Sequence, residues 1–272
     1  MIRIEGGHFM KAMIFIGHGS RTEEGNRSFI DFVSKAISEL RPSIGAYAFL
    51  EKANPTIPTA INSCVDKGAT EISIIPILLL SGIHANVDIP LEIEKAKLQF
   101  PDTSFYYASP IGIDEIMVHI VEKRLKEKGF QNQQDEKVLL VAHGSRDKGA
   151  EFEFEKLASL IGEKYFDKIA LGYLKASPNY RNVLQIQSKS TDQKIYIVPY
   201  LLFSGGFTLQ IKRSIEEISL QFPIQKMILC NPIGFDRDLI ALLRKRIDEV
   251  TNADHFHWKG IIEDERFLSD SH

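Results

Sequence analysis

The chain has 272 residues, a formal net charge of −3, and hydrophobic residues at 44% of its positions. This length suits two domains of ordinary size, and the composition allows each domain to bury a core of its own. The slight negative charge offers no general attraction to nucleic acid or to an anionic membrane, so neither is expected as a partner and any recognition of an anion must be local.

Short apolar runs alternate with longer segments of helical period along the first half. In residues 24–40, for example, Phe29, Phe32, Val33 and Ala36 have the spacing of one face of a helix. Strands are predicted at 12–17, 44–50, 71–80 and 104–108, and helices at 24–40, 57–67, 89–99 and 114–128. Alternating strands and helices with nearly continuous apolar strands predict an α/β fold, with a small parallel sheet flanked by helices on both faces.

The second half repeats the first. Strands are predicted at 137–142, 168–174, 194–203 and 226–230, and helices at 149–165, 179–188, 209–221 and 236–250. Four short motifs, at 17–21, 76–82, 100–101 and 110–114, return in the same order about 120 to 125 residues later, at 143–146, 199–205, 222–223 and 232–236. We therefore predict a tandem duplication, with domains at 10–131 and 136–252, a cleft between them, and a polar tail at 253–272.

The cysteines and the apolar stretches indicate a cytoplasmic protein. Cys64 and Cys230 lie in different halves without Cys-x-x-Cys spacing, so neither a disulfide framework nor an iron–sulfur cluster is expected. The longest apolar stretch, residues 72–83, is too short for a membrane span and contains Pro76, which favours a buried strand. Residues 1–9 lack the pattern of a secretory signal, and either Met1 or Met10 fits as the start.

Three polar side chains of the first half follow predicted strands: His18 the first, Glu51 the second and His84 the third. Ligands of open parallel sheets bind beyond the carboxyl ends of the strands, so the fold is expected to bring these residues to one rim. Two imidazoles and a carboxylate suit a first-row divalent metal and leave coordination positions open. Each residue alone has an ordinary structural alternative, such as a loop hydrogen bond or a helix start, but their common place on the rim favours a metal site.

The loops around these residues carry further expectations. Backbone amides at 19–21 and 80–84 suit an anionic group of a ligand. Asp88, one helical turn after His84, is expected to cap the following helix. The alternative is that Asp88 accepts a hydrogen bond from His84 and orients it.

These motifs together resemble the class II tetrapyrrole chelatases over nearly all of residues 12–250. The residues that carry the resemblance are Gly17 to Arg21, Phe49 to Glu51 with Pro55, Pro76 to Gly82, His84 with Asp88 to Pro90, and Pro110 to Gly112. The two-domain length is similar to that of the bacterial sirohydrochlorin ferrochelatases. The resemblance implies insertion of Fe²⁺ into sirohydrochlorin with release of two protons and no organic cofactor, since the metal is itself a substrate.

The same resemblance assigns roles to residues of the first half. His18 and His84 carry the metal, His18 also accepts a proton, and Glu51 helps to bind metal or substrate. The loop of Leu79, Leu80, Ser81, Gly82, Ile83 and His84 lines the substrate. A monomer is expected, because both halves of the cleft belong to one chain.

The second half departs from this pattern. His143 persists, but the region equivalent to Glu51 reads Tyr173-Leu174-Lys175, and Phe207 stands where His84 would be. A lone histidine cannot organise metal transfer, so the second half is expected to act as a wall of the cleft, with Phe207 packed against a flat macrocycle.

Two other functions remain open. One is a cobaltochelatase of cobalamin synthesis, since histidine and glutamate bind Co²⁺ at least as well as Fe²⁺. Long cobaltochelatases often carry a histidine-rich stretch and extra cysteines, and this chain has neither, which favours iron. The other is a metal or tetrapyrrole carrier without turnover, against which the complete set of His18, Glu51 and His84 argues.

Overall fold

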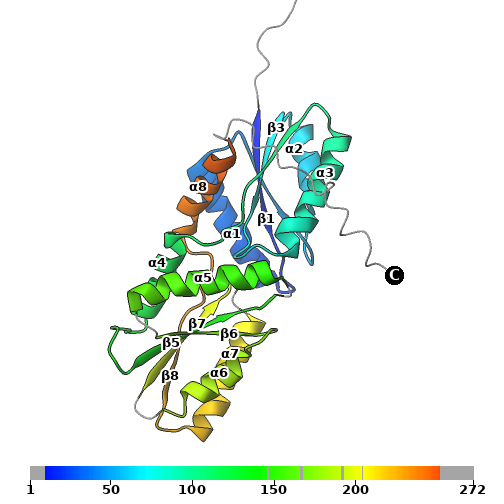
Figure 1. Ribbon diagram of the computed structural model, residues 1–272. Coiled ribbons are helices and arrows are strands. Elements are labelled where there is room, and N and C mark those ends of the chain that lie inside the picture. The colour runs from blue at the N-terminus through cyan, green and yellow to red at the C-terminus, as the bar shows by residue number, and fades with distance from the viewer. Residues whose placement is uncertain (1–9, 146, 166–167, 191–192, 204, 252–272) are drawn as a thin grey trace, which may run out of the picture.

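The structure is a computed structural model that describes residues 10–145, 147–165, 168–190, 193–203 and 205–251. The predicted polar tail at 253–272 lies outside the described residues. The described chain forms two four-stranded parallel sheets, one from each half, with helices packed on them (Figure 1). No helix in this part of the chain has the length and apolar character that a membrane crossing requires.

The first half builds a sheet of strand order β2-β1-β3-β4. Its elements in chain order are β1 (Lys11–Gly17), α1 (Glu23–Leu40), β2 (Ile44–Phe49), α2 (Ile57–Asp66), β3 (Glu71–Pro76), the π-helix η1 (His84–Asp88), α3 (Ile89–Gln99), β4 (Ser104–Tyr107) and α4 (Glu115–Lys126). In the register of the central strand, Gly17 pairs with Phe49, and Ile16 pairs with Pro76. The carboxyl ends of β1, β2 and β3 therefore lie side by side.

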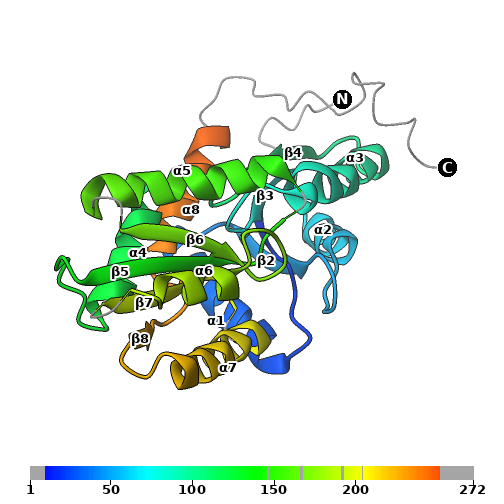
Figure 2. The same ribbon diagram turned by 60° about the horizontal axis from the view of Figure 1, so that its bottom comes forward.

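The second half repeats this order as β6-β5-β7-β8. Its elements are β5 (Glu136–Ala142), α5 (Lys148–Tyr165), β6 (Ile169–Tyr173), α6 (Tyr180–Gln187), β7 (Lys194–Tyr200), α7 (Gly206–Gln221), β8 (Lys226–Leu229) and α8 (Leu239–Thr251). Figure 2 shows α5 along one face of this sheet and α6 and α7 against the other. The predicted α/β repeats are thus present in the structure.

Alternate residues of the central strand β1 face different helical layers. Phe15 belongs to a core that includes Phe29 and Val33 of α1, whereas Ile14 and Ile16 belong to a second core with residues of α2 and α3. All three strand side chains are fully buried, and each such burial stabilises the fold by about 1.5–3 kcal/mol. Burial on both faces explains why the strand has a continuous apolar sequence rather than an alternating one.

The last helix of each half packs on the other half. Helix α4 contacts β7 and α5, and α8 contacts β3, β4 and α1. Figure 1 shows α8, in orange, beside α1 of the first half. One core cluster accordingly runs through both halves and includes residues of α4, α5 and α8. Periodicity along the sequence predicts these helices but not this exchange.

Arg124 of α4 fixes its side of the exchange. Its guanidinium donates to the carbonyl oxygens of Pro232 (2.8 Å) and Ile233 (2.8 Å) and to a carboxylate oxygen of Asp236 (2.7 Å). These acceptors lie in the segment just before α8.

Arg246 of α8 makes the reciprocal contacts. It donates to the carbonyl oxygens of Pro110 (3.1 Å) and Ile111 (2.9 Å), while Lys245 donates to Asp114 at 2.5 Å. The two halves are therefore interlocked by equivalent basic residues on exchanged helices.

Two predicted strands extend too far. The third strand ends at Pro76 rather than at residue 80, and its counterpart ends at Tyr200 rather than at residue 203. The amide of Ile77 still donates to the oxygen of Ile16, but beyond it the oxygens of Leu78 and Leu79 accept from the amides of Ile111 and Gly112, which lie outside the strands. The apolar run continues beyond the point at which a partner strand is present, so hydrophobicity alone misplaces its end. The last helix likewise begins at Leu239 rather than at residue 236.

Candidate metal centre

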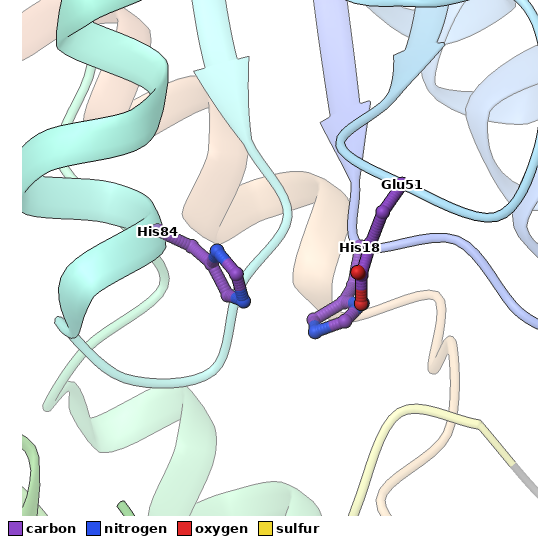
Figure 3. Close-up of side chains that lie close together, drawn as sticks. All are labelled: His18, Glu51 and His84. Atoms are coloured by element: carbon purple, nitrogen blue, oxygen red, sulfur yellow. The ribbon is translucent and has the colours of Figure 1, made fainter. Parts of the chain in front are cut away.

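The structure brings His18, Glu51 and His84 together at the carboxyl ends of the first sheet. One possible ligand atom from each of them lies within 4.8 Å of the others. His18 Nδ1 is 3.3 Å from Glu51 Oε1, and the His18 and His84 rings lie 4.8 Å apart at 85°. Figure 3 shows His84 on one side and His18 with Glu51 on the other, directed toward a common space.

Gly19 holds the first two of these residues together. The amide of Glu51 donates to the oxygen of His18 at 3.1 Å, which fixes the loops after β1 and β2 against each other. Gly19 has φ +88°, and a Cβ at this position would lie 1.9 Å from the backbone carbonyl oxygen of Glu51. Glycine is therefore required here both for its backbone conformation and for the close approach of the neighbouring loop.

His84 is oriented by Asp88, at the other end of η1. His84 Nδ1 lies 2.6 Å from Asp88 Oδ2, so the Nε2 side of the ring is left for a metal. The expectation that Asp88 caps the next helix is wrong, because its side chain makes no capping bond. The π-helix runs directly into α3 with Asp88 in helical conformation (φ −67°, ψ −48°), so no helix terminus remains to be capped there.

The residue after Glu51 modifies the charge of the site. Lys52 has φ +65°, uncommon for a residue with a side chain, and its amine contacts Glu51 Oε1. The hydrogen bond from Lys52 is the main cause that lowers the pKa of the Glu51 carboxyl, which is therefore charged at neutral pH. The sequence pattern does not single out Lys52, because a left-handed backbone at a lysine cannot be predicted from the residue type.

The pKa of His18 is lowered as well, but chiefly by burial, followed by the nearby His84 and Lys52. A lowered pKa keeps the imidazole neutral at physiological pH, with a lone pair available to a metal or a proton. The three candidate ligands have side-chain exposures of 36%, 44% and 43% for His18, Glu51 and His84. The site is therefore open, which suits an exchangeable metal better than a closed structural one.

The chain is held by a contact on each side of His84. The Ser81 amide donates to Glu153 Oε2 of α5 at 2.8 Å, so the second half touches this loop directly. On the other side, the Tyr107 hydroxyl donates to the oxygen of Ala85 at 2.8 Å. The remaining loop residues expected to line a substrate are half-buried or exposed, and they are Leu79, Leu80, Gly82 and Ile83.

The second half has the same backbone arrangement with different side chains. The Lys175 amide donates to the oxygen of His143 at 2.9 Å, as the Glu51 amide does to His18. The rings of His143 and Phe207 lie 5.0 Å apart, close to the separation of the His18 and His84 rings. Lys175 and Phe207 thus occupy the places of Glu51 and His84. Among the described residues, one group of three side chains is arranged to hold a metal, and it lies in the first half.

A duplicated α/β fold with an open set of candidate metal ligands at the rim of one sheet is typical of a metal-binding protein of two related halves. The chain belongs to the CbiX family, whose model matches residues 12–128 and again residues 137–250. The double match confirms the tandem duplication expected from the repeated motifs.

Relatives with known names agree with this membership. The chain is 34% identical over 247 residues to the sirohydrochlorin ferrochelatase of Priestia megaterium, covering 90% of this chain and 92% of that protein. It is 32% identical over 252 residues to the sirohydrochlorin cobaltochelatase of the same organism, covering 90% and 81%. The structure of SirB from Bacillus subtilis with Fe³⁺ matches with a TM-score of 0.81 at 31% identity, over 88% of this chain and 94% of that one.

Proposed function

We propose that this protein is a sirohydrochlorin ferrochelatase, a lyase that inserts Fe²⁺ into sirohydrochlorin and releases two protons. The observation that carries this proposal is the convergence of His18, Glu51 and His84 at an open rim. The near full-length relation to a curated ferrochelatase supports the choice of substrate. A monomer in the cytoplasm fits the proposal, since both halves of the substrate cleft are then supplied by one chain.

In this proposal the first half presents the metal to one face of the macrocycle. His18, Glu51 and His84 hold Fe²⁺ through few ligands, so coordination positions remain for the pyrrole nitrogens. Asp88 fixes the His84 ring through the 2.6 Å contact at Nδ1. The loop of residues 79–84 lines the macrocycle, and no organic cofactor takes part.

His18 is the proposed proton acceptor. Its pKa is lowered chiefly by burial, so its imidazole is neutral before the reaction. When the metal moves into the ring, the lone pair of His18 is released and takes one of the two pyrrole N–H protons, and the other passes to water at the open rim. Glu51 is a weaker base because the hydrogen bond from Lys52 lowers its pKa, and it therefore acts as a metal ligand.

A cobaltochelatase is the second candidate. It is favoured by the 32% identity to the Priestia megaterium cobaltochelatase. It is also favoured by a structure of the Bacillus subtilis sirohydrochlorin chelatase SirB in complex with cobalt, which matches with a TM-score of 0.77 at 30% identity. The imidazole and carboxylate donors accept either ion, so the donor set does not choose between them.

Absorption spectroscopy separates these functions. The purified protein is mixed under anaerobic conditions with sirohydrochlorin and either Fe²⁺ or Co²⁺, and the rate is compared with a blank without protein. Multiple turnovers that are faster with iron support the proposal, and faster turnover with cobalt favours the second candidate. A stable spectral shift without turnover indicates a carrier.

Variants locate the working site. His18→Ala is expected to lower the rate by at least about 100-fold, whereas His119→Ala, on an exposed position of α4, is expected to leave it unchanged. Loss of activity in His143→Ala as complete as in His18→Ala would contradict a single working site in the first half.

A further inference from the structure

We propose that the second half holds a carboxylate of the macrocyclic substrate at Lys175, beside an apolar wall formed by Phe207. This inference rests on the proposed function, because it names how a carboxylate-bearing tetrapyrrole is held opposite the metal ligands.

The fold places Lys175 where the first half places a metal ligand. Besides the bond from the Lys175 amide to His143, the Leu174 amide donates to the Ala142 oxygen at 2.9 Å, as the Leu50 amide does to Gly17. Gly144 has φ +87°, against +88° for Gly19. The same strand-end scaffold therefore presents an amine in one half and a carboxylate in the other.

The charge of this position is inverted, and no described residue neutralises it. Lys175 is exposed, and within the described part of the chain no carboxylate lies within ion-pair distance of its amine. In the first half, by contrast, Lys52 is paired with Glu51. A chain with a net charge of −3 must recognise an anion through local cations, and an exposed ammonium without a carboxylate partner among the described residues is suited to this.

Phe207 supplies the apolar part of the same rim. Its side chain is 37% exposed and packs edge to face on His143, with ring centroids 5.0 Å apart. A flat aromatic surface beside a cation matches a macrocycle that has an apolar ring and carboxylates at its edge. Neither residue is a first-row metal ligand of the kind found in the first half.

The second rim also lies next to the first. Helix α5 begins at Lys148, shortly after His143, and its Glu153 accepts from the Ser81 amide in the loop before His84. An aromatic chain runs from Phe203 through Phe235 to Phe29, with centroid distances of 5.1 Å and 5.8 Å. A ligand at the metal site therefore has the second rim within its surroundings.

Equilibrium binding of metal-free sirohydrochlorin tests this inference. Lys175→Met is expected to raise the Kd about tenfold, because a charge-assisted hydrogen bond is lost, while Lys175→Arg keeps the Kd near the wild-type value. The matched control is Lys189→Met, an exposed lysine just beyond the far end of the eight-residue helix α6. The affinity for Co²⁺ without the macrocycle is expected to be the same in all of these proteins.

Two results would overturn the inference in distinguishable ways. Equal Kd values for Lys175→Met and Lys189→Met, with binding intact in the wild type, would remove Lys175 from the substrate site and leave the proposed function standing. Failure of the wild type to bind sirohydrochlorin at all would overturn the proposed function together with this inference.

Discussion

Lys52 is expected to compete with a metal ion for the carboxylate of Glu51, since its amine contacts Glu51 Oε1, the atom that lies 3.3 Å from His18 Nδ1. Lys52→Met is expected to tighten Co²⁺ binding about two- to fivefold, because it frees the carboxylate and removes a positive charge beside the site. Calorimetric titration at neutral pH measures this change.

The pH dependence of metal binding provides a second measurement on the same variant. Lys52 contributes to lowering the pKa of His18, so its removal raises that pKa and protonation of His18 begins at higher pH. Metal affinity in Lys52→Met is therefore expected to fall at a higher pH than in the wild type. The control is Lys67→Met, an exposed lysine at the far end of α2. Weaker metal binding at neutral pH in Lys52→Met would contradict the competition.

Asp88 contacts His84 and makes no capping bond to the helix that follows, so we expect it to act through His84. Asp88→Ala is expected to weaken Co²⁺ binding by about tenfold, which is typical for loss of a partner that orients a metal-binding histidine. Thermal unfolding is expected to change little, because Asp88 makes no capping bond to α3. Asp102→Ala, at an exposed turn before β4, is the matched control. A loss of stability without a change in metal affinity would show that Asp88 is a structural residue.

In the strand-end loops, substitution of the equivalent glycines Gly19 and Gly144 distinguishes an effect on stability from an effect on metal binding. A Cβ on Gly19 would lie 1.9 Å from the backbone carbonyl oxygen of Glu51. A Cβ on Gly144 would lie 2.8 Å from the Cβ of Ala176. Each position has positive φ, so Gly19→Ala and Gly144→Ala are expected to lower the free energy of unfolding by at least about 1 kcal/mol. Only Gly19→Ala is expected to abolish metal binding, because it displaces Glu51 from His18.

Chemical denaturation and Co²⁺ titration of the two glycine variants, side by side, provide the measurement. The Gly144→Ala protein serves as the control for the general cost of a Cβ in this turn. Full metal affinity in Gly19→Ala would show that the contact between the two loops does not position the ligands.

The same loops explain which parts of the site the sequence predicts. His18 and Glu51 are predicted because each directly follows an apolar strand, and parallel pairing places the ends of adjacent strands together. The partnership of His84 with Asp88 is weighed only as an alternative, because the π-helix between them is not expected from residue type. Lys52 is missed because a left-handed backbone leaves no pattern in the sequence. Glu153 is missed because its contact with the Ser81 amide joins the two halves and so leaves no local pattern.

The exchange of α4 and α8 is a property of the whole molecule that helical periodicity does not contain. An amphipathic helix has the same pattern whether it packs on its own half or on the other. A signal does exist in the repeat: Lys123 and Arg124 return as Lys245 and Arg246, and Asp114 returns as Asp236. In the structure each basic pair contacts the aspartate of the other half.

The stability that the exchanged helices provide is expected to depend on pH, because Asp114 and Asp236 are titratable. Burial raises the pKa of Asp236, but bonds from the Asp238 amide, Lys123 and Arg124 outweigh it, and the pKa is lowered overall. The pKa of Asp114 is lowered in the same way, chiefly by Lys245 against the effect of burial. A carboxylate with a lowered pKa stabilises the fold above the pKa of the unfolded chain, about 3.9, and this contribution is lost as the pH falls through the folded value.

Asp236→Asn is therefore expected to lower the free energy of unfolding at pH 7 by about 2–4 kcal/mol, because it leaves Arg124 with a neutral partner in a largely buried contact. The difference from the wild type is expected to begin to shrink below about pH 4, where the aspartate of the unfolded chain takes up its proton, and to shrink further as the pH falls toward the lower pKa of the folded protein. Urea denaturation between pH 3 and pH 7 measures both curves, with Asp66→Asn, exposed at the end of α2, as the control. Parallel curves for the wild type and Asp236→Asn over this range would show that the charge of Asp236 does not hold the exchanged helices in place.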